Sequence, residues 1–274
     1  MVKCLVSRIR LKRYCVHDKK HISILSKSMI QDIITFYRNP YACFQAGSGE
    51  SIKERIVALR KMYFFCIYMA IMIGLIIVIL DGILKNTYNI SIYENLRKMR
   101  AEFRATNSRL DNFLKMCLIT PFIEESLFRL PLLTKSRLLR WVVFFVLVQF
   151  FFPLPFQLEI SFWWYNAILI FIFAGIIIFN DVSQSDSIPV FYPKNYNYLC
   201  WGSTIVFSLA HVANFAPLQL SIFYLYPIYV LPQFVHGIAQ SYLAIRYNSI
   251  LWSFLLHAAI NSTSEIHKLL TDLF

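Results

Sequence analysis

Two adjacent glutamates and one arginine interrupt a mostly apolar stretch at about 113–133. They are Glu124, Glu125 and Arg129, in the segment Pro121-Phe-Ile-Glu-Glu-Ser-Leu-Phe-Arg129. A charged side chain at the centre of a bilayer costs about 2.5–3.5 kcal/mol on insertion scales, so three in one helix are expected to pair or to have a function. Glu125 and Arg129 are four residues apart, which places them on one helical face as an ion pair. Glu124 points about 100° away and has no local partner.

A carboxylate without a partner in an apolar setting is suited to proton transfer. Desolvation changes the proton affinity of Glu124, and the residue can then act as a general base toward a water molecule. Two alternatives remain open from this stretch alone. The cluster can be a packing device held together by its ion pair, or it can mark the end of a helix in the head-group layer.

Two further polar motifs lie on apolar segments in the C-terminal half. The first is Phe207-Ser-Leu-Ala-His211 and the second is His257-Ala-Ala-Ile-Asn261. His257 and Asn261 are four residues apart and so face the same way on a helix. Acid–base chemistry on a water molecule needs a proton acceptor, a proton donor and groups that stabilise a developing oxyanion. His211 can share the water or pass the proton, and His257 and Asn261 can donate hydrogen bonds to the oxyanion.

Each histidine also has a simpler interpretation. A single histidine inside a membrane can serve as a hydrogen-bonding link between helices, which is worth about 0.6–2 kcal/mol. His236 and Gln240 have the same four-residue spacing in the same apolar setting. We assign His236 and Gln240 to helix packing, and we expect His236 to lie outside the site.

The composition indicates a helical membrane protein. Hydrophobic residues make up 58% of the 274 residues, above the roughly 45–50% that is typical of a soluble domain. Several apolar runs approach the roughly 20 residues that span a bilayer. We therefore expect an all-α, multi-pass transmembrane bundle of about seven or eight membrane helices, in a bacterial cytoplasmic membrane. The spacing of the six cysteines indicates neither a disulfide framework nor a structural zinc.

The net charge of +12 is concentrated near the N-terminus. Residues 1–61 hold 13 Lys and Arg against 4 Asp and Glu, a net of +9. A basic segment before the first span indicates a cytoplasmic N-terminus close to anionic lipid. The basic residues are dispersed through an apolar, amphipathic stretch, which argues against nucleic acid as a partner. We expect an interfacial helix at 22–37 within this extension.

The chain divides into three parts: the basic extension 1–61, a first transmembrane helix with a polar connection at 62–112, and a core at 113–268. The apolar part of the first helix is 62–80, and Asp81-Gly82 is expected to end it. The connection is itself basic, and a single crossing would place it outside, against the positive-inside rule. A charged helix along the surface, or one more crossing, would resolve this conflict. The helices expected further along are 113–133, 141–152, 162–179, 199–214, 218–231, 233–246 and 249–265, with a loop at 180–198.

Taken together, the three motifs resemble the CPBP family of membrane proteins. Glu-Glu-x-x-x-Arg, Phe-x-x-x-His and His-x-x-x-Asn follow in this order in the CAAX proteases and bacteriocin-processing enzymes, also called Abi or type II CAAX prenyl endopeptidase-like proteins. Ile119-Thr-Pro121 and Arg246-Tyr-Asn-Ser-Ile250 also look like the family. The resemblance covers about 113–262. Leu130 departs from it, because many members have glycine after the arginine, and this bears on helix packing more than on chemistry.

The resemblance implies an intramembrane endopeptidase that cuts a membrane-associated protein or peptide. Such enzymes are often described as metallopeptidases, and the sequence does not distinguish a metal-bound water from a glutamate-activated one. A prenylated CaaX tail, a leader peptide and a sorting signal all remain open as substrates. The residues implied are Glu124, His211, His257 and Asn261 as catalytic groups, Glu125, Arg129 and Phe207 as supporting groups, and Glu124, His211 and His257 as ligands of a divalent metal such as zinc.

Two other functions remain open. An ion- or proton-coupled transporter also places Glu, His and Arg inside the membrane, although the sequence contains no evident inverted repeat. A catalytically inert family member would act as a membrane scaffold or immunity protein, although all four candidate catalytic residues are present. The endopeptidase hypothesis requires Glu124, His211, His257 and Asn261 to converge on one polar cavity that opens to lipid or to one membrane face.

Overall fold

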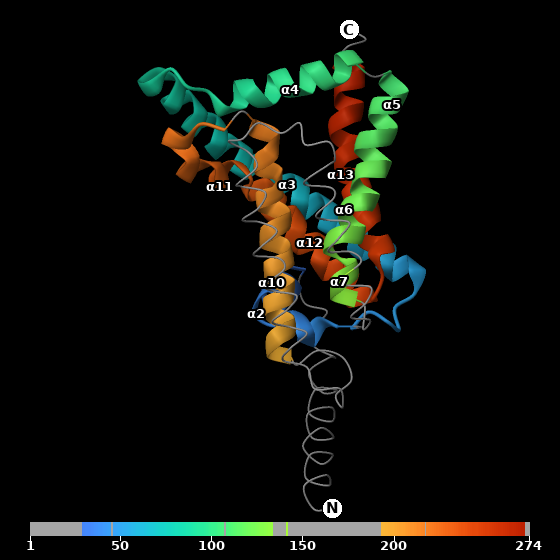
Figure 1. The fold of residues 1–274 in the computed structure, drawn as a ribbon. Helices are drawn as coiled ribbons and strands as arrows, with labels where there is room; N and C mark the ends of the chain where they lie inside the picture. The colour runs from blue at the N-terminus through green and yellow to red at the C-terminus, as the bar shows by residue number, and fades with distance from the viewer. Residues whose placement is uncertain are drawn as a thin grey trace, which may run out of the picture.

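The described part of the chain consists of helices and the connections between them. The computed structural model describes residues 29–44, 46–106, 108–133, 141, 193–216 and 218–271 (Figure 1). These residues contain no strand, which confirms the all-α prediction. Residues 1–28 and the expected helices at 141–152 and 162–179, apart from Trp141, lie outside them. In chain order the elements are α2 (Met29–Arg38), η2 (Pro40–Cys43), α3 (Ile52–Tyr88), α4 (Ile92–Thr106), α5 (Arg109–Leu114), the π-helical turn η3 (Lys115–Ile119), α6 (Thr120–Phe128), α7 (Leu130–Leu133), α10 (Pro193–Ala210), η4 (His211–Phe215), η5 (Leu220–Leu225), α11 (Tyr226–Tyr229), α12 (Leu231–Tyr247) and α13 (Ile250–Thr271).

The longest helix, α3, begins with a capping box. The Ser51 hydroxyl accepts the backbone N–H of Glu54, and the Glu54 carboxylate accepts the backbone N–H of Ser51. With 37 residues the helix is about 55 Å long at 1.5 Å per residue. Large apolar side chains are exposed along it between Phe64 and Ile83. In the described part of the chain, α3 is the one unbroken helix long and apolar enough to cross a membrane, and η5 and α11 followed by α12 would form a second span only with a bend of 41°.

The prediction that Asp81-Gly82 ends this helix is wrong. The helix continues for two more turns and ends at Asn89, whose left-handed backbone (φ 55°) forms the C-cap. Gly82 is tolerated because a glycine inside a helix costs only about 1 kcal/mol relative to alanine. Asp81 is tolerated because its carboxylate is buried against hydrogen-bond donors of the next helix.

Helix α4 forms part of the basic connection between the first helix and the core. It lies crosswise to α10 and α13 at one end of the molecule (Figure 1). Its Ile92 and Leu96 side chains are buried, whereas Arg97 and Lys98 are exposed. Arg97 and Lys98 of the connection therefore lie on the exposed face of an amphipathic helix, as the first of the two expected solutions requires. The position of this helix relative to a membrane stays a prediction.

Prolines divide the helix that was expected at 113–133. The π-helical turn η3 lies just before Pro121, and the helix breaks at Arg129 just before Pro131. Proline has no N–H and its ring clashes with the preceding turn, so each break falls upstream of the proline. The second break separates the Phe128 carbonyl from its helical donor, and the hydroxyl of Ser203 on α10 donates to that carbonyl instead.

The C-terminal half differs from the predicted helices mainly at their ends. Helix α10 begins at Pro193, a residue suited to the first turn, so the predicted loop is wrong for 193–198. The helix predicted at 199–214 becomes 3-10 helical from His211 onward. The helix predicted at 218–231 is replaced by η5 and the short α11, since Ile222 has non-helical backbone angles. Helices α12 and α13 confirm the two last predictions.

The segment at 29–51 packs against the bundle. Phe36 and Cys43 are buried in the same apolar cluster as Leu199 of α10 and Leu243 of α12. The backbone N–H of Tyr41 donates to the Asn197 side chain at 3.4 Å. The basic extension is thus in contact with the core from α2 onward.

Ion pairs of Arg246, at the end of α12, attach the segment 29–51 to the bundle. Its guanidinium pairs with Glu50 and lies 3.6 Å from Asp32. The hydroxyl of Tyr247 donates to Glu50 at 2.9 Å, and the N–H of Gly47 donates to the Arg246 carbonyl at 3.0 Å. The Arg246 side chain is 13% exposed, so these charges are largely removed from water.

We expect Arg246→Gln to lower the unfolding temperature in detergent substantially. The change leaves Asp32 and Glu50 without their cation, and loss of one partner of a buried pair costs up to about 3–5 kcal/mol. Lys85→Gln, which breaks the exposed pair between Lys85 and Glu94, is the control and should change the unfolding temperature little. Equal shifts in the two variants would contradict the assignment of Arg246 as the link to the N-terminal segment.

Candidate active site

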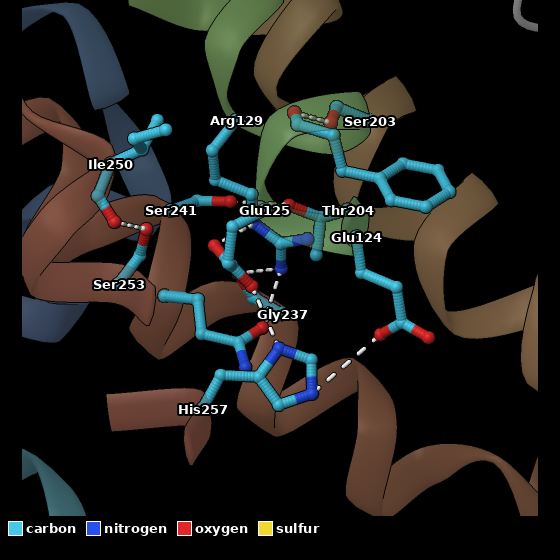
Figure 2. A network of polar contacts seen from close by, with 12 residues as sticks. Glu124, Glu125, Arg129, Ser203, Thr204, Gly237, Ser241, Ile250, Ser253 and His257 are labelled. Carbon is cyan, nitrogen blue, oxygen red and sulfur yellow. Dashed lines mark hydrogen bonds and ion pairs between the residues drawn. The ribbon is translucent and has the colours of Figure 1, made fainter. Parts of the chain in front are cut away.

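Three elements that are distant in sequence bring ionisable side chains together. Glu124 comes from α6, His211 is the first residue of η4, and His257 lies in α13. The Oε2 atom of Glu124 is 3.6 Å from Nε2 of His257 and 3.9 Å from Nε2 of His211. Figure 2 marks the contact with His257 by a dashed line. The structure therefore brings together three of the four residues expected to be catalytic.

Behind these three residues runs a chain of buried polar contacts. Glu125 uses one carboxylate oxygen for Nδ1 of His257, at 3.0 Å, and the other for Nε of Arg129, at 3.4 Å. Neither the Glu125 nor the Arg129 side chain is exposed at all. Arg129 Nη2 in turn donates to the Gln240 side chain at 2.7 Å and to the Gly237 carbonyl at 3.3 Å. The expected ion pair of Glu125 and Arg129 thus also fixes the orientation of His257 (Figure 2).

The hydrogen-bond partners of the two histidines determine which nitrogen faces Glu124. His257 Nδ1 faces the Glu125 carboxylate, and His211 Nδ1 lies 2.8 Å from the Phe207 carbonyl oxygen. Both partners only accept hydrogen bonds, so each Nδ1 carries a proton. In the neutral ring, Nε2 then presents a lone pair, and both Nε2 atoms lie near the Glu124 carboxylate. Acceptors that converge in this way are satisfied by a shared donor such as water.

The separations and the exposure suit a water molecule at this point. Distances of 3.6 and 3.9 Å are too long for direct hydrogen bonds, but one water can lie at about 2.8 Å from both atoms of each pair. The Glu124 side chain is 13% exposed and that of His211 is 18% exposed. Glu125 and Arg129 are sealed from solvent, so the accessible end of the cluster is the end formed by Glu124 and His211.

Two imidazoles and a carboxylate also have the chemistry of a zinc site. Among the residues that the structure describes, however, no group of three His, Cys, Asp or Glu side chains is placed so that it could hold a metal ion. The structure therefore does not support the expected ligand set of Glu124, His211 and His257.

The expectation that Asn261 points toward a substrate oxygen is not met. Its Nδ2 atom donates to the backbone carbonyl of Met116 at 2.8 Å. In the π-helical turn the N–H of Thr120 bonds the Lys115 carbonyl, five residues back. The next donor in that register would be Pro121, which has no N–H, so the Met116 carbonyl lacks a helical partner. Asn261 supplies the missing donor and joins α13 to α6.

Sequence reasoning missed two residues that hold Arg129. Gln240 was assigned to packing, but its fully buried amide is a direct partner of the guanidinium. Gly237 supplies a carbonyl at a tightly packed position, where a Cβ would lie 3.1 Å from the Phe207 ring and would require that ring to move slightly. The signal available in the sequence was Arg129 itself, whose five N–H donors exceed what Glu125 can accept.

Phe207 and His236 occupy the walls of the site. The Phe207 ring lies 4.1 Å from the Arg129 guanidinium and makes edge contacts with His211 and His257, in keeping with a supporting role. His236 is hydrogen-bonded to the backbone of Cys66 on α3, as a packing residue would be. It also interacts electrostatically with His211 and His257, so it is nearer to the site than expected.

The cluster has the parts of an acid–base site: a partly exposed carboxylate, two oriented imidazoles beside it, and a buried ion pair that orients one of them. No protein-family model, curated protein or solved structure matches this chain. The chemistry of these side chains and their separations are therefore what supports a function.

We expect Asn261→Ala to destabilise the protein by about 1 kcal/mol, because the partly buried Met116 carbonyl then remains without a protein donor. Pro121→Ala restores a backbone N–H at the position that lacks one. The double variant should therefore recover most of the lost stability, and thermal unfolding of the four proteins in detergent forms a double-mutant cycle. Additive effects of the two changes would show that Asn261 does not compensate for Pro121.

We also expect Glu125→Gln to be far more damaging to the fold than Glu124→Gln. The first change leaves a fully buried guanidinium without its anion, at a cost of about 3–5 kcal/mol. The second removes a partly exposed charge that has no arginine partner. Expression yield and unfolding temperature measure the difference, and a Glu125→Gln protein as stable as the wild type would rule out the ion pair as the support of the site.

Proposed function

We propose that the chain is an intramembrane endopeptidase that hydrolyses a peptide bond of a membrane-associated protein or peptide. The observation that supports this most is the placement of Glu124 Oε2 within 3.6 and 3.9 Å of two histidine Nε2 atoms. The side chains of Glu124 and His211 are partly exposed, whereas His257 and the ion pair that orients it are buried. The proposal also has the support of the resemblance of the three motifs to the CPBP family.

In the proposed reaction, Glu124 is the general base. It takes one proton from a water that it shares with His211 Nε2, and the water oxygen attacks the carbonyl carbon. When the C–N bond breaks, the proton passes from Glu124 to the leaving nitrogen. Water has then been added across the peptide bond, and Glu124 has returned to its starting state.

His257 is assigned to the oxyanion. The lone pair on His257 Nε2 can take up a proton from water, which converts the neutral ring to an imidazolium. The Nε2 atom then becomes a donor toward the carbonyl oxygen on which negative charge develops. Glu125 supports the imidazolium from the other nitrogen, as the buried aspartate does for the histidine of serine proteases. Asn261 acts here as a positioning residue for α13.

The membrane setting is supported by α3. It is long enough to cross a bilayer, and its large apolar side chains are exposed over the length that would face lipid. A multi-pass bundle in the bacterial cytoplasmic membrane would also use α10, α12 and α13, with lipid as the surrounding partner. A proton-coupled transporter is the second candidate, because the same buried charges could carry a proton.

Comparison of newly formed peptide N-termini tests the proposal directly. Host membranes containing the wild type or Glu124→Gln would be analysed by mass spectrometry of N-terminal peptides. We expect termini that depend on Glu124, with the rate lowered about 10²–10⁴-fold in the variant, as for loss of a general base. His211→Ala should have a similar effect. Normal cleavage by folded Glu124→Gln would overturn the mechanism, and the absence of any new terminus would favour the transporter.

His236→Ala is the matched control among the histidines. It removes an imidazole close to the site that hydrogen-bonds α3 rather than Glu124. Most of the cleavage activity should remain, with a modest loss of stability. A loss as large as that in His211→Ala would show that the site includes α12 at this position.

A further inference from the structure

Asp81 is a buried carboxylate outside the catalytic cluster that accepts four hydrogen bonds. Its Oδ1 atom accepts the backbone N–H groups of Ile92, at 2.9 Å, and Tyr93, at 3.2 Å, and the hydroxyl of Tyr229, at 2.9 Å. Its Oδ2 atom accepts the hydroxyl of Ser91 at 2.6 Å. One side chain of α3 therefore holds both the start of α4 and the end of α11.

This arrangement suits a carboxylate that is removed from water. The first backbone N–H groups of a helix have no acceptor within the helix, and they carry the positive end of its dipole. Ser91 accepts the N–H of Glu94 at 3.1 Å, and Asp81 accepts those of Ile92 and Tyr93. The start of α4 thus offers Asp81 donors that offset the cost of burial.

The two helices held by Asp81 enclose the segment that carries His211. Both α4 and α11 pack on η4, at the end of the molecule where α3 turns into α4 (Figure 1). Val212 and Phe215 of η4 are buried in one apolar cluster with Ile92 and Leu96 of α4. The Phe215 ring also lies 5.7 Å from that of Tyr229, edge to face. His211 immediately precedes these anchored residues.

We propose that Asp81 is a positioning residue for His211: by holding α4 and α11 on two sides of η4, it fixes the segment from which the imidazole extends toward Glu124. The role of His211 in hydrolysis rests on the proposed function, but the placement of its ring does not. Asp81 itself touches neither the substrate nor the reacting atoms.

The test follows the His211 ring directly. Full-length protein with ¹³C-labelled histidine rings, in detergent micelles, gives signals from six histidines, and the signals lost in His211→Gln and His257→Gln assign the two that matter. In Asp81→Asn one acceptor oxygen becomes an NH₂ group, which cannot accept a hydrogen bond, and the negative charge that faces the start of α4 is lost. We expect the His211 signal to shift or broaden and the His257 signal to stay in place. With a membrane-anchored reporter that the wild type cleaves, kcat should fall about tenfold at unchanged KM.

Two further variants keep the outcome decisive. Tyr229→Phe removes a single hydroxyl and should shift the His211 signal in the same way but to a smaller extent. If Asp81→Asn does not fold, the His211 signal of Tyr229→Phe tests the proposal by itself. Glu94→Gln removes an exposed carboxylate from the same end of α4, where it pairs with Lys85, and should leave both histidine signals and kcat unchanged. An unchanged His211 signal in the folded variants, or an equal shift of the His257 signal, would overturn the proposal. A wild type that cleaves no reporter would refute the proposed function while the signals still test the role of Asp81.

Discussion

A buried guanidinium needs a counter-charge and polar partners within the protein, and this requirement organises the centre of the molecule. Arg129 is fully enclosed, so its partners come from the protein: the Glu125 carboxylate, the Gln240 amide and the Gly237 carbonyl. These contacts bring α6 against α12, and the Phe207 ring of α10 covers the cation. The second oxygen of Glu125 then holds His257 at 3.0 Å. The orientation of a histidine beside Glu124 thus depends on an ion pair that no solvent reaches.

Prolines give the same helices their irregular shape, and polar side chains from elsewhere compensate. Pro121 leaves the Met116 carbonyl without a donor, and Asn261 provides one. The break before Pro131 frees the Phe128 carbonyl, which Ser203 satisfies. Each compensation joins two helices that are far apart in sequence, because a freed carbonyl inside a bundle must be paired. Hydrogen bonds between helices therefore form at the two places where the helix is interrupted, one from α13 and one from α10.

Local spacing explains what was predictable. The pairing of Glu125 with Arg129 follows from four residues on a helix, and α12 and α13 follow from their apolar length. What depends on long-range packing was not predictable. Gln240 meets Arg129 across 111 positions, and Asn261 turned from the expected site because a distant helix contains a π-helical turn. Asp81 was expected to end a helix. Its role as hydrogen-bond acceptor for the start of α4 depends on how the chain folds back after α3, and local spacing does not reveal this.

The length of α3 bears on where in the membrane hydrolysis would take place. Its apolar part, 62–80, covers about 28 Å, close to the thickness of the hydrocarbon layer. Asp81 directly follows that part, and α4, which packs on the segment beginning with His211, lies beyond it. In the proposed endopeptidase the Asp81 carboxylate and the start of α4 would then be near the level of the lipid head groups. The segment that begins with His211 packs on this helix, so water would enter the site from the aqueous phase on this side.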